Sequence, residues 1–259
     1  MPTGLAVQRL RPLRPRVLSC PNLNAVHAVG VVFAVRAGHK PSDDAEPLVV
    51  ARVVQNQYAG RMARPREFDE NRVLLAVRDE FWDKGYAATS MDDLLRVSGL
   101  GKGSLYGAFG DKRSLFLRVL REYDDANLLA LRERLASAAK GVDVVREFVL
   151  GLTGDPTGAA ARRGCLLANS NAELAASTPD VAAEARRSYD AITAVLTTAL
   201  ERARSEGDLD PGADPSETAR AALVAQLGLI ALGRTGMDID ALSTTAHSTL
   251  ARLLPAPAQ

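Results

Sequence analysis

The fold of this chain is decided by residues 89–112, which read TSMDDLLRVSGLGKGSLYGAFGDK. Ser90 is followed three residues later by Asp93, which is a capping-box-like helix start, and Ser98-Gly99 is expected to stop that helix. A short turn then leads into another short helix over Lys102–Phe109. Together with a helix upstream, this spacing predicts a helix-turn-helix unit.

Residues 102–109 have the composition of a helix that enters the major groove of DNA. Leu105 and Phe109 lie four positions apart and form an inner face, which leaves small and polar residues on the outside. Lysine can meet phosphate or guanine, serine and tyrosine can meet phosphate, and glycine lets the backbone approach closely. The residues predicted to contact DNA are Ser90, Lys102, Gly103, Ser104, Tyr106, Gly107 and Lys112.

The segment 89–112, with FWDKGY at 81–86, closely resembles the DNA-binding signature of the TetR family, the tetracycline-repressor-like regulators. The resemblance is specific over residues 68–120. It implies that Tyr106 and Lys112 sit at phosphate-contact positions and Phe109 at a core position. Gly107 departs from the family pattern, because many members carry a larger side chain there.

The charge over residues 62–113 is balanced, with nine basic and nine acidic residues. DNA binding is therefore expected from the placement of a few cations rather than from a strong field. Arg64 and Arg66 precede the first helix and are predicted to reach the DNA as a flexible arm.

Working outward, helical signals extend over most of the chain, and the fold class predicted is all-α. An upstream helix is expected between Asp69 and Gly85, and a long one from Gly110-Asp111 to about Ala138. Further helices are predicted over 142–152, 163–176, 179–205, 215–233 and 240–254. The predicted domains are a helix-turn-helix domain over 62–113 and a helical effector-binding and dimerisation domain over 114–259.

Residues 1–61 differ in composition from the rest. They carry eight basic residues against three acidic ones, six prolines and no sustained periodicity, so we expect them to be mostly disordered. Met62 opens the new compositional regime and is a candidate for the true start of the protein.

Composition excludes several classes of protein. Two cysteines cannot form a disulfide framework, and with three histidines they cannot form a standard Cys/His zinc cluster. The apolar run 25–35 is too short to cross a bilayer, which needs about 20 residues. We expect a cytoplasmic protein with no membrane partner, no metal site and no cofactor. An enzyme is not expected either, since no nucleophile–base pair or phosphate loop is evident.

Two helices near the C-terminus, 215–233 and 240–254, are predicted to form a homodimer interface. Their apolar stripes are Leu223, Leu227 and Ile230 on the first and Leu242, Ala246, Leu250 and Leu253 on the second. The family resemblance implies a four-helix bundle formed by this pair from each subunit. The alternative left open is that these stripes belong to the core of the monomer.

The helices between about 115 and 206 are predicted to enclose a pocket for a small-molecule effector. Its candidate lining residues are Phe148, Leu152, Cys165, Leu166, Asn169, Glu173 and Tyr189. Cys165 follows Arg162-Arg163 near a helix start, where cations and the helix dipole can lower a thiol pKa. A buried packing role for Cys165 and a structural hydrogen-bonding role for Asn169 and Glu173 are the alternatives.

The function predicted is that of a dimeric, ligand-responsive transcriptional repressor on a palindromic DNA operator. The alternatives are a DNA-binding activator without an effector and, with little support, a helical enzyme. The identities of the effector, the operator and the regulated genes are not encoded in any pattern of the sequence.

Overall fold

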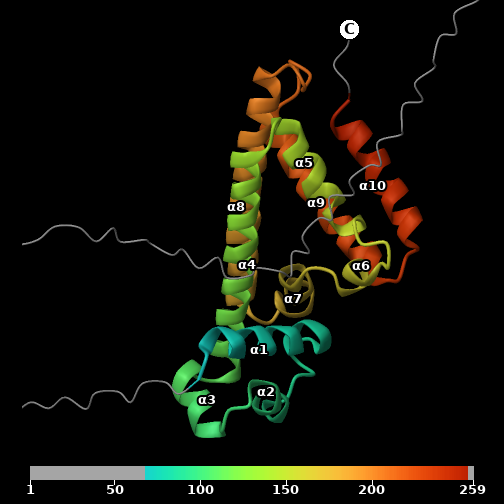
Figure 1. Ribbon diagram of the computed structural model, residues 1–259. Helices are drawn as coiled ribbons and strands as arrows, with labels where there is room; N and C mark the ends of the chain where they lie inside the picture. The colour runs from blue at the N-terminus through green and yellow to red at the C-terminus, as the bar shows by residue number, and fades with distance from the viewer. Residues whose placement is uncertain (1–67, 256–259) are drawn as a thin grey trace, which may run out of the picture.

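The computed structural model describes residues 68–255, and all regular elements in this range are helical (Figure 1). This confirms the predicted all-α class. The first four helices are α1 (Glu70–Lys84), α2 (Met91–Ser98), α3 (Lys102–Phe109) and α4 (Lys112–Ser137). They are followed by α5 (Gly141–Leu150), the 3₁₀ turn η1 (Gly151–Thr153), α6 (Ala159–Arg163), α7 (Leu166–Leu174), α8 (Pro179–Ser205), α9 (Pro215–Arg234) and α10 (Ile239–Leu253). None of these described helices is both long and apolar enough to cross a bilayer.

The helices α1, α2 and α3 form a compact unit whose bounds follow from local signals. The Asp69 carboxylate caps α1 by accepting a hydrogen bond from the backbone N–H of Arg72, at 3.2 Å. Ser90 and Asp93 form the reciprocal capping box that the sequence predicts for α2. The inner residues of α3, Leu105 and Phe109, are 1% and 6% exposed. The predicted helix-turn-helix is therefore present, with the predicted bounds for α2 and α3.

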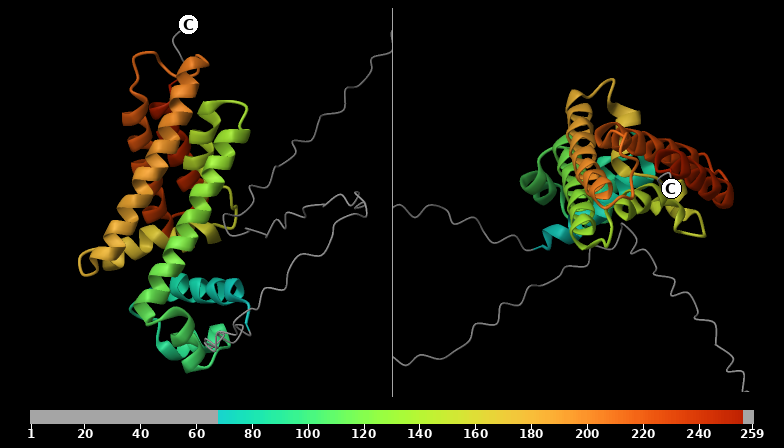
Figure 2. Two further views of the ribbon diagram at one scale, coloured as in Figure 1. Left: turned by 90° about the vertical axis from the view of Figure 1, so that its left-hand side faces the viewer. Right: turned by 90° about the horizontal axis from the view of Figure 1, so that it is seen from above.

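The long helix α4 connects this unit to the rest of the molecule. Its 26 residues span about 39 Å at 1.5 Å per residue. Asp111 caps its start by accepting from the backbone N–H of Ser114 at 2.7 Å. Figure 2 shows α4 running from the helix-turn-helix unit up into the bundle. Any tilt of α4 would therefore move the helix-turn-helix unit.

The remaining helices pack around a second core. It lies between the distal half of α4 and the helices α5, α8, α9 and α10 (Figure 1). Leu196, Ala199, Leu200, Leu242 and Ala246 are fully buried there. Alanines between the leucines bring the helices close together.

The predicted single helix over 163–176 is wrong, because the chain breaks at Gly164. α6 ends at Arg163, and α7 begins only at Leu166. Gly164 has φ +70°, a left-handed conformation that glycine adopts without a Cβ penalty. A Cβ at this position would also lie 3.0 Å from the Arg234 side chain. The break is set by tertiary contacts, so helical periodicity could not reveal it.

The first core extends beyond the helix-turn-helix unit. Phe81 and Leu105 share one cluster with Phe116 of α4, Leu166 of α7 and Val181 of α8. Side chains from both sides of residue 113 thus pack together, so the two predicted domains are joined by a continuous apolar contact. The predicted boundary itself stays a prediction.

The apolar stripes assigned to dimerisation lie mostly inside the monomer. Leu242, Ala246 and Leu250 on α10 and Leu223 and Ile230 on α9 are buried within the single chain. For these residues the structure supports the alternative of a monomer core, because α8 and α5 contact α9 and α5 contacts α10 within the same chain. The predictions for residues 1–61, Met62 and the arm at Arg64 and Arg66 lie outside the described residues.

Candidate nucleic-acid interface and effector cavity

The outer face of α3 is open to solvent. Lys102, Gly103, Ser104 and Gly107 are exposed, and Tyr106 is 38% exposed. A Cβ added at Gly103 or Gly107 would meet nothing within 4 Å among the described residues. This face therefore has room for a closely approaching partner.

The N-terminus of α3 differs from its neighbours in having spare donors. Side chains cap α1, α2 and α4, whereas among residues 68–255 no side chain caps α3, which begins after Gly101. The first backbone N–H groups of a helix lack intrahelical acceptors and lie at its positive end. This end of α3 is therefore suited to bind a phosphate group.

Two lysines flank the exposed face. The Lys102 ammonium lies 6.0 Å from the centre of the Tyr106 ring and has no ion-pair partner among the described residues. The Lys112 ammonium lies 4.3 Å from the centre of the Tyr86 ring. Burial lowers the pKa of Lys112, and the nearby Glu173 charge opposes this shift. Lys112 is thus held in place from within the protein.

Ser90 is occupied by the cap of α2. Its hydroxyl donates to Asp93 Oδ2 at 2.7 Å and accepts from the Asp93 backbone N–H at 3.1 Å. Lys84, Ser90 and Arg96 hold the pKa of Asp93 well below its usual range, and the Lys84 hydrogen bond contributes most. Lys84 and Arg96 thus pair with Asp93, whereas Lys102 on α3 has no ion pair among residues 68–255 and Lys112 has only the nearby Glu173 charge.

Comparison with known proteins identifies the family. Residues 73–119 match the family model described as bacterial regulatory proteins, tetR family, and residues 141–249 match the tetracyclin repressor-like C-terminal domain. The chain is 31% identical over 185 residues to the HTH-type transcriptional regulator YezE of Bacillus subtilis, covering 70% of this chain and 94% of YezE. The chain belongs to the TetR family.

One further relative resembles this chain in sequence, and two solved structures resemble it in fold. The HTH-type transcriptional repressor ComR of Escherichia coli is 26% identical over 193 residues, which cover 74% of this chain and 91% of ComR. The reduced form of Escherichia coli NemR has a TM-score of 0.64 and 19% identity, covering 73% of this chain and 98% of NemR. A cysteine mutant of CifR, a TetR-family regulator solved with a 26-bp operator, has a TM-score of 0.61 and 25% identity, covering 74% of this chain and all of CifR.

This TetR-family chain contains a cavity of about 790 Å³ between its two parts. The wall is formed by α4, α5, the α6–α7 junction, α8 and α9, and by Trp82 from α1. Of the residues predicted from sequence, Phe148, Leu152, Cys165 and Tyr189 line it. Because Trp82 belongs to the helix-turn-helix unit, the DNA-binding part of this TetR-family protein forms part of the cavity wall.

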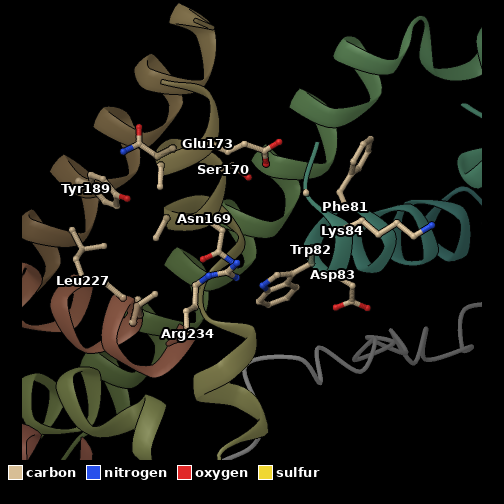
Figure 3. A pocket seen from close by; sticks show the side chains of 16 residues that line it. Phe81, Trp82, Asp83, Lys84, Asn169, Ser170, Glu173, Tyr189, Leu227 and Arg234 are labelled. Atoms are coloured by element: carbon tan, nitrogen blue, oxygen red, sulfur yellow. The ribbon is translucent and has the colours of Figure 1, made fainter. Parts of the chain in front are cut away.

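The other three predicted pocket residues lie outside this cavity. Leu166 is buried in the first core. Asn169 and Glu173 line a second hollow, of about 710 Å³, between α1, α7 and α9 (Figure 3). The spacing of Asn169 and Glu173 was compatible with ligand binding, but both side chains are used for contacts within the protein.

Glu173 joins α7 to the DNA-binding unit. Its carboxylate accepts hydrogen bonds from the backbone N–H groups of Tyr86, at 3.1 Å, and Ala87, at 2.8 Å. A Cβ at Gly85 would lie 2.8 Å from Glu173 Oε2, and Gly85 has φ +82°. Glycine is therefore required where α1 ends, both for the turn and for this contact.

Cys165 is not the activated thiol that its flanking arginines indicated. Its sulfur accepts a hydrogen bond from the Tyr123 hydroxyl at 3.7 Å, and burial raises the pKa of the Cys165 thiol. The Arg163 guanidinium points instead to Asp83 and Asp79, at 2.9 and 3.1 Å. Of the two alternatives for Cys165, the structure favours the buried packing role, because burial raises the pKa of its thiol and the Arg163 cation pairs with Asp79 and Asp83 instead.

Sequence reasoning missed the junction at Arg163. Its carbonyl oxygen accepts three hydrogen bonds, from Trp82 Nε1 at 3.2 Å, Asn169 Nδ2 at 3.0 Å and Arg234 Nη1 at 3.1 Å. Its guanidinium also lies 4.3 Å from the centre of the Trp82 ring. Helices α1, α7 and α9 thus meet at one peptide group beside the cavity, and Figure 3 shows Trp82, Asn169 and Arg234 converging.

Only part of this arrangement has a signal in the sequence. Gln226 interrupts the apolar stripe of Leu223 and Ile230 on α9, and a polar amide at that spacing could have marked a cavity wall. No local pattern distinguishes Arg163 or Trp82 from ordinary surface and core residues, because their partners lie 71 to 84 positions away in the sequence.

Proposed function

We propose that this protein is a homodimeric transcriptional repressor that leaves its operator when a small molecule occupies the cavity. The observation that carries the proposal is the way in which α3 divides its residues between a buried face and an exposed face. Its apolar face is buried, and its outer face presents an uncapped N-terminus with Lys102, Ser104 and Tyr106 exposed. These are the groups that contact phosphates and base edges in a major groove.

The relatives favour repression over activation. ComR and BdcR, two relatives from Escherichia coli, are named as transcriptional repressors. FasR from Mycolicibacterium smegmatis is named as an activator, but it matches over 33% of this chain and BdcR over 28%, so the preference for repression rests on ComR, which matches over 74%. A reporter gene placed behind the operator distinguishes the two, since a repressor lowers its expression.

Exposed faces of α9 and α10 support the homodimer. Small side chains at helical spacing lie on both, namely Val224, Gly228 and Ala231 on α9 and Ala241, Thr245 and Ser248 on α10. Val224 is 69% exposed in the single chain. Helices with small residues on their surface can approach closely, and a dimer places two copies of α3 in successive major grooves about 34–36 Å apart.

The position of Trp82 supports coupling between cavity and DNA. Trp82 lines the cavity, belongs to α1 and donates to the Arg163 carbonyl. A ligand that displaces the indole ring shifts α1 relative to α9, and this changes the separation of the two α3 helices in a dimer. Such a ligand acts only through a difference in affinity between the two arrangements.

The experiment compares Tyr106→Ala and Tyr106→Phe with the wild type. Operator fragments are first selected from random duplex DNA, and their affinity is then measured by fluorescence anisotropy. We expect Tyr106→Ala to weaken binding about 10-fold, because a phosphate contact and a ring contact are lost, and Tyr106→Phe to lose less. Light scattering checks that both variants remain dimeric. An unchanged operator affinity in Tyr106→Ala would refute the assigned role of α3.

A further inference from the structure

The charged side chains in the cavity wall already have partners. Arg134 pairs with Glu147 at 3.6 Å, and Arg163 pairs with Asp79 and Asp83. Asp124 accepts hydrogen bonds from Ser188 and Arg187, and Asp155 accepts from Thr157 and from the backbone N–H of Ala160. A charged ligand would lose its hydration without finding a free counter-charge among these groups. The cavity is therefore suited to an uncharged molecule.

Gln226 is different from the charged residues of the wall. It lies on α9 between Leu223 and Leu227, and its side-chain oxygen is buried without a hydrogen-bond partner among residues 68–255. A buried amide oxygen without a partner costs free energy. The terminal torsion of glutamine is soft, so the amide can rotate to meet a ligand in the cavity that Gln226 lines. A ligand that offers both an N–H donor and a carbonyl acceptor can satisfy the whole amide.

The rest of the wall favours rings. Trp82, Tyr123, Phe148 and Tyr189 all contribute, and Trp82 meets Tyr123 edge-on at 4.9 Å between ring centres. Aromatic walls attract further aromatic groups in stacked or edge-on arrangements. A cavity of about 790 Å³ lies within the usual range for drug-sized ligands.

We infer that the ligand of this cavity is an uncharged aromatic carboxamide, whose amide pairs with Gln226 and whose ring packs beside Trp82. The regulatory consequence of binding rests on the proposed function, whereas the chemistry of the site does not. Gln226 determines specificity, because its side-chain oxygen is the buried polar atom of this wall that has no hydrogen-bond partner among residues 68–255.

The test uses the single tryptophan of the chain, Trp82, as its reporter. The full-length protein is titrated with 4-cyclohexylbenzamide, with 4-cyclohexylbenzoate and with 4-cyclohexyltoluene, which share one shape and differ in charge and hydrogen bonding. Tryptophan emission should change with the amide, and the amide should bind about 10-fold tighter than the hydrocarbon. The benzoate should bind more weakly than the amide. Equal binding of hydrocarbon and amide, tighter binding of the benzoate, or no response to any of the three overturns the inference.

Two variants sharpen the assignment. Gln226→Leu should weaken amide binding about 10-fold and leave hydrocarbon binding nearly unchanged. Arg220→Leu on the exposed side of the same helix is the control and should bind all three probes like the wild type. Amide binding that Gln226→Leu does not alter contradicts the pairing, and the wild-type probe series stays decisive if Gln226→Leu does not fold.

Operator release is measured separately by anisotropy. If the amide binds beside Trp82 but DNA stays bound, release by this ligand class is refuted and the assigned chemistry of the cavity stands. If the amide does not bind while Tyr106→Ala still weakens operator binding, the assigned chemistry is refuted and the DNA-binding role stands.

Discussion

The two short helices α3 and α7 pack into the same core but present opposite surfaces. Both bury apolar residues, Leu105 and Phe109 on α3 and Leu166 and Leu167 on α7. The polar side of α3 faces solvent, and its Lys102 has no carboxylate partner among the described residues. The polar side of α7 is occupied, since Asn169 binds the Arg163 carbonyl and Glu173 binds the turn after α1.

This difference indicates that α3 and α7 have different roles: α3 is suited to bind an external partner, and α7 to pass on movements of neighbouring helices. A helix with spare donors on its surface can bind an external partner without breaking any internal contact. A helix such as α7, whose Asn169 and Glu173 side chains bind neighbouring segments of the chain, responds when those neighbours move. We therefore propose that α3 contacts DNA, whereas α7 couples the cavity to the helix-turn-helix unit.

The largest expected effect is on operator affinity and comes from a substitution on the exposed face of α3. Lys102→Glu should weaken operator binding on the order of 100-fold, because a cation facing phosphate becomes an anion. Stability should change little, since Lys102 is exposed and has no carboxylate partner in the described range. Fluorescence anisotropy measures the affinity. Arg132→Glu, the same charge reversal on an exposed site of distal α4, is the control, and an equal loss there would show a general charge effect instead.

A pair of glycine substitutions compares the two helices directly. Gly164→Ala before α7 should cost about 1–3 kcal/mol of unfolding free energy, because φ is +70° and a Cβ would crowd Arg234. Gly107→Ala inside α3 should instead gain about 0.5–1 kcal/mol, since alanine favours helix and nothing lies within 4 Å among the described residues. Urea denaturation measures both. The same sign for both variants would contradict the contrast.

A smaller effect is expected at Glu173. Glu173→Ala removes two hydrogen bonds to the backbone of Tyr86 and Ala87 and should cost about 1 kcal/mol. The local readout is hydrogen exchange, which should become faster at these two amides. Glu201→Ala, an exposed site on α8, serves as the control. Unchanged exchange at Tyr86 and Ala87 would remove Glu173 from the coupling path.

The smallest expected effect is on the stability of the fold at acidic pH. The pKa of Asp93 lies below its ordinary value of 3.8, chiefly because of Lys84 and then Ser90. Its stabilisation is therefore fully present above pH 3.8 and is lost as the pH falls toward the folded-state pKa. Asp93→Asn should make the acid side of the stability curve flatter, as followed by circular dichroism. A curve that Asp93→Asn leaves unaltered would show that the cap of α2 does not control acid stability.

Signals from neighbouring residues were sufficient to predict the helix bounds of the DNA-binding unit. The caps Asp69, Ser90 and Asp111 and the stop at Gly85 act within a few residues, so α1–α3 and the start of α4 follow from the sequence. The C-terminal half was harder to predict. Gly164 divides the helix that periodicity predicted as continuous over 163–176. Leu223 and Leu242, which were predicted to lie in a dimer interface, are buried within the single chain. An apolar stripe shows that a face is covered but does not show by which neighbour.

The sequence by itself determined most of the helices, the exposed outer face of α3 and the family, because caps, periodicity and the motif at residues 89–112 depend on residues close together in the chain. Only the tertiary structure decided that Trp82 borders the cavity, that Cys165 is a packed thiol and that three helices share the Arg163 carbonyl. Apart from the bond between Asn169 and Arg163, these features join residues 42 to 81 positions apart, and their energies depend on burial and orientation that no local pattern records.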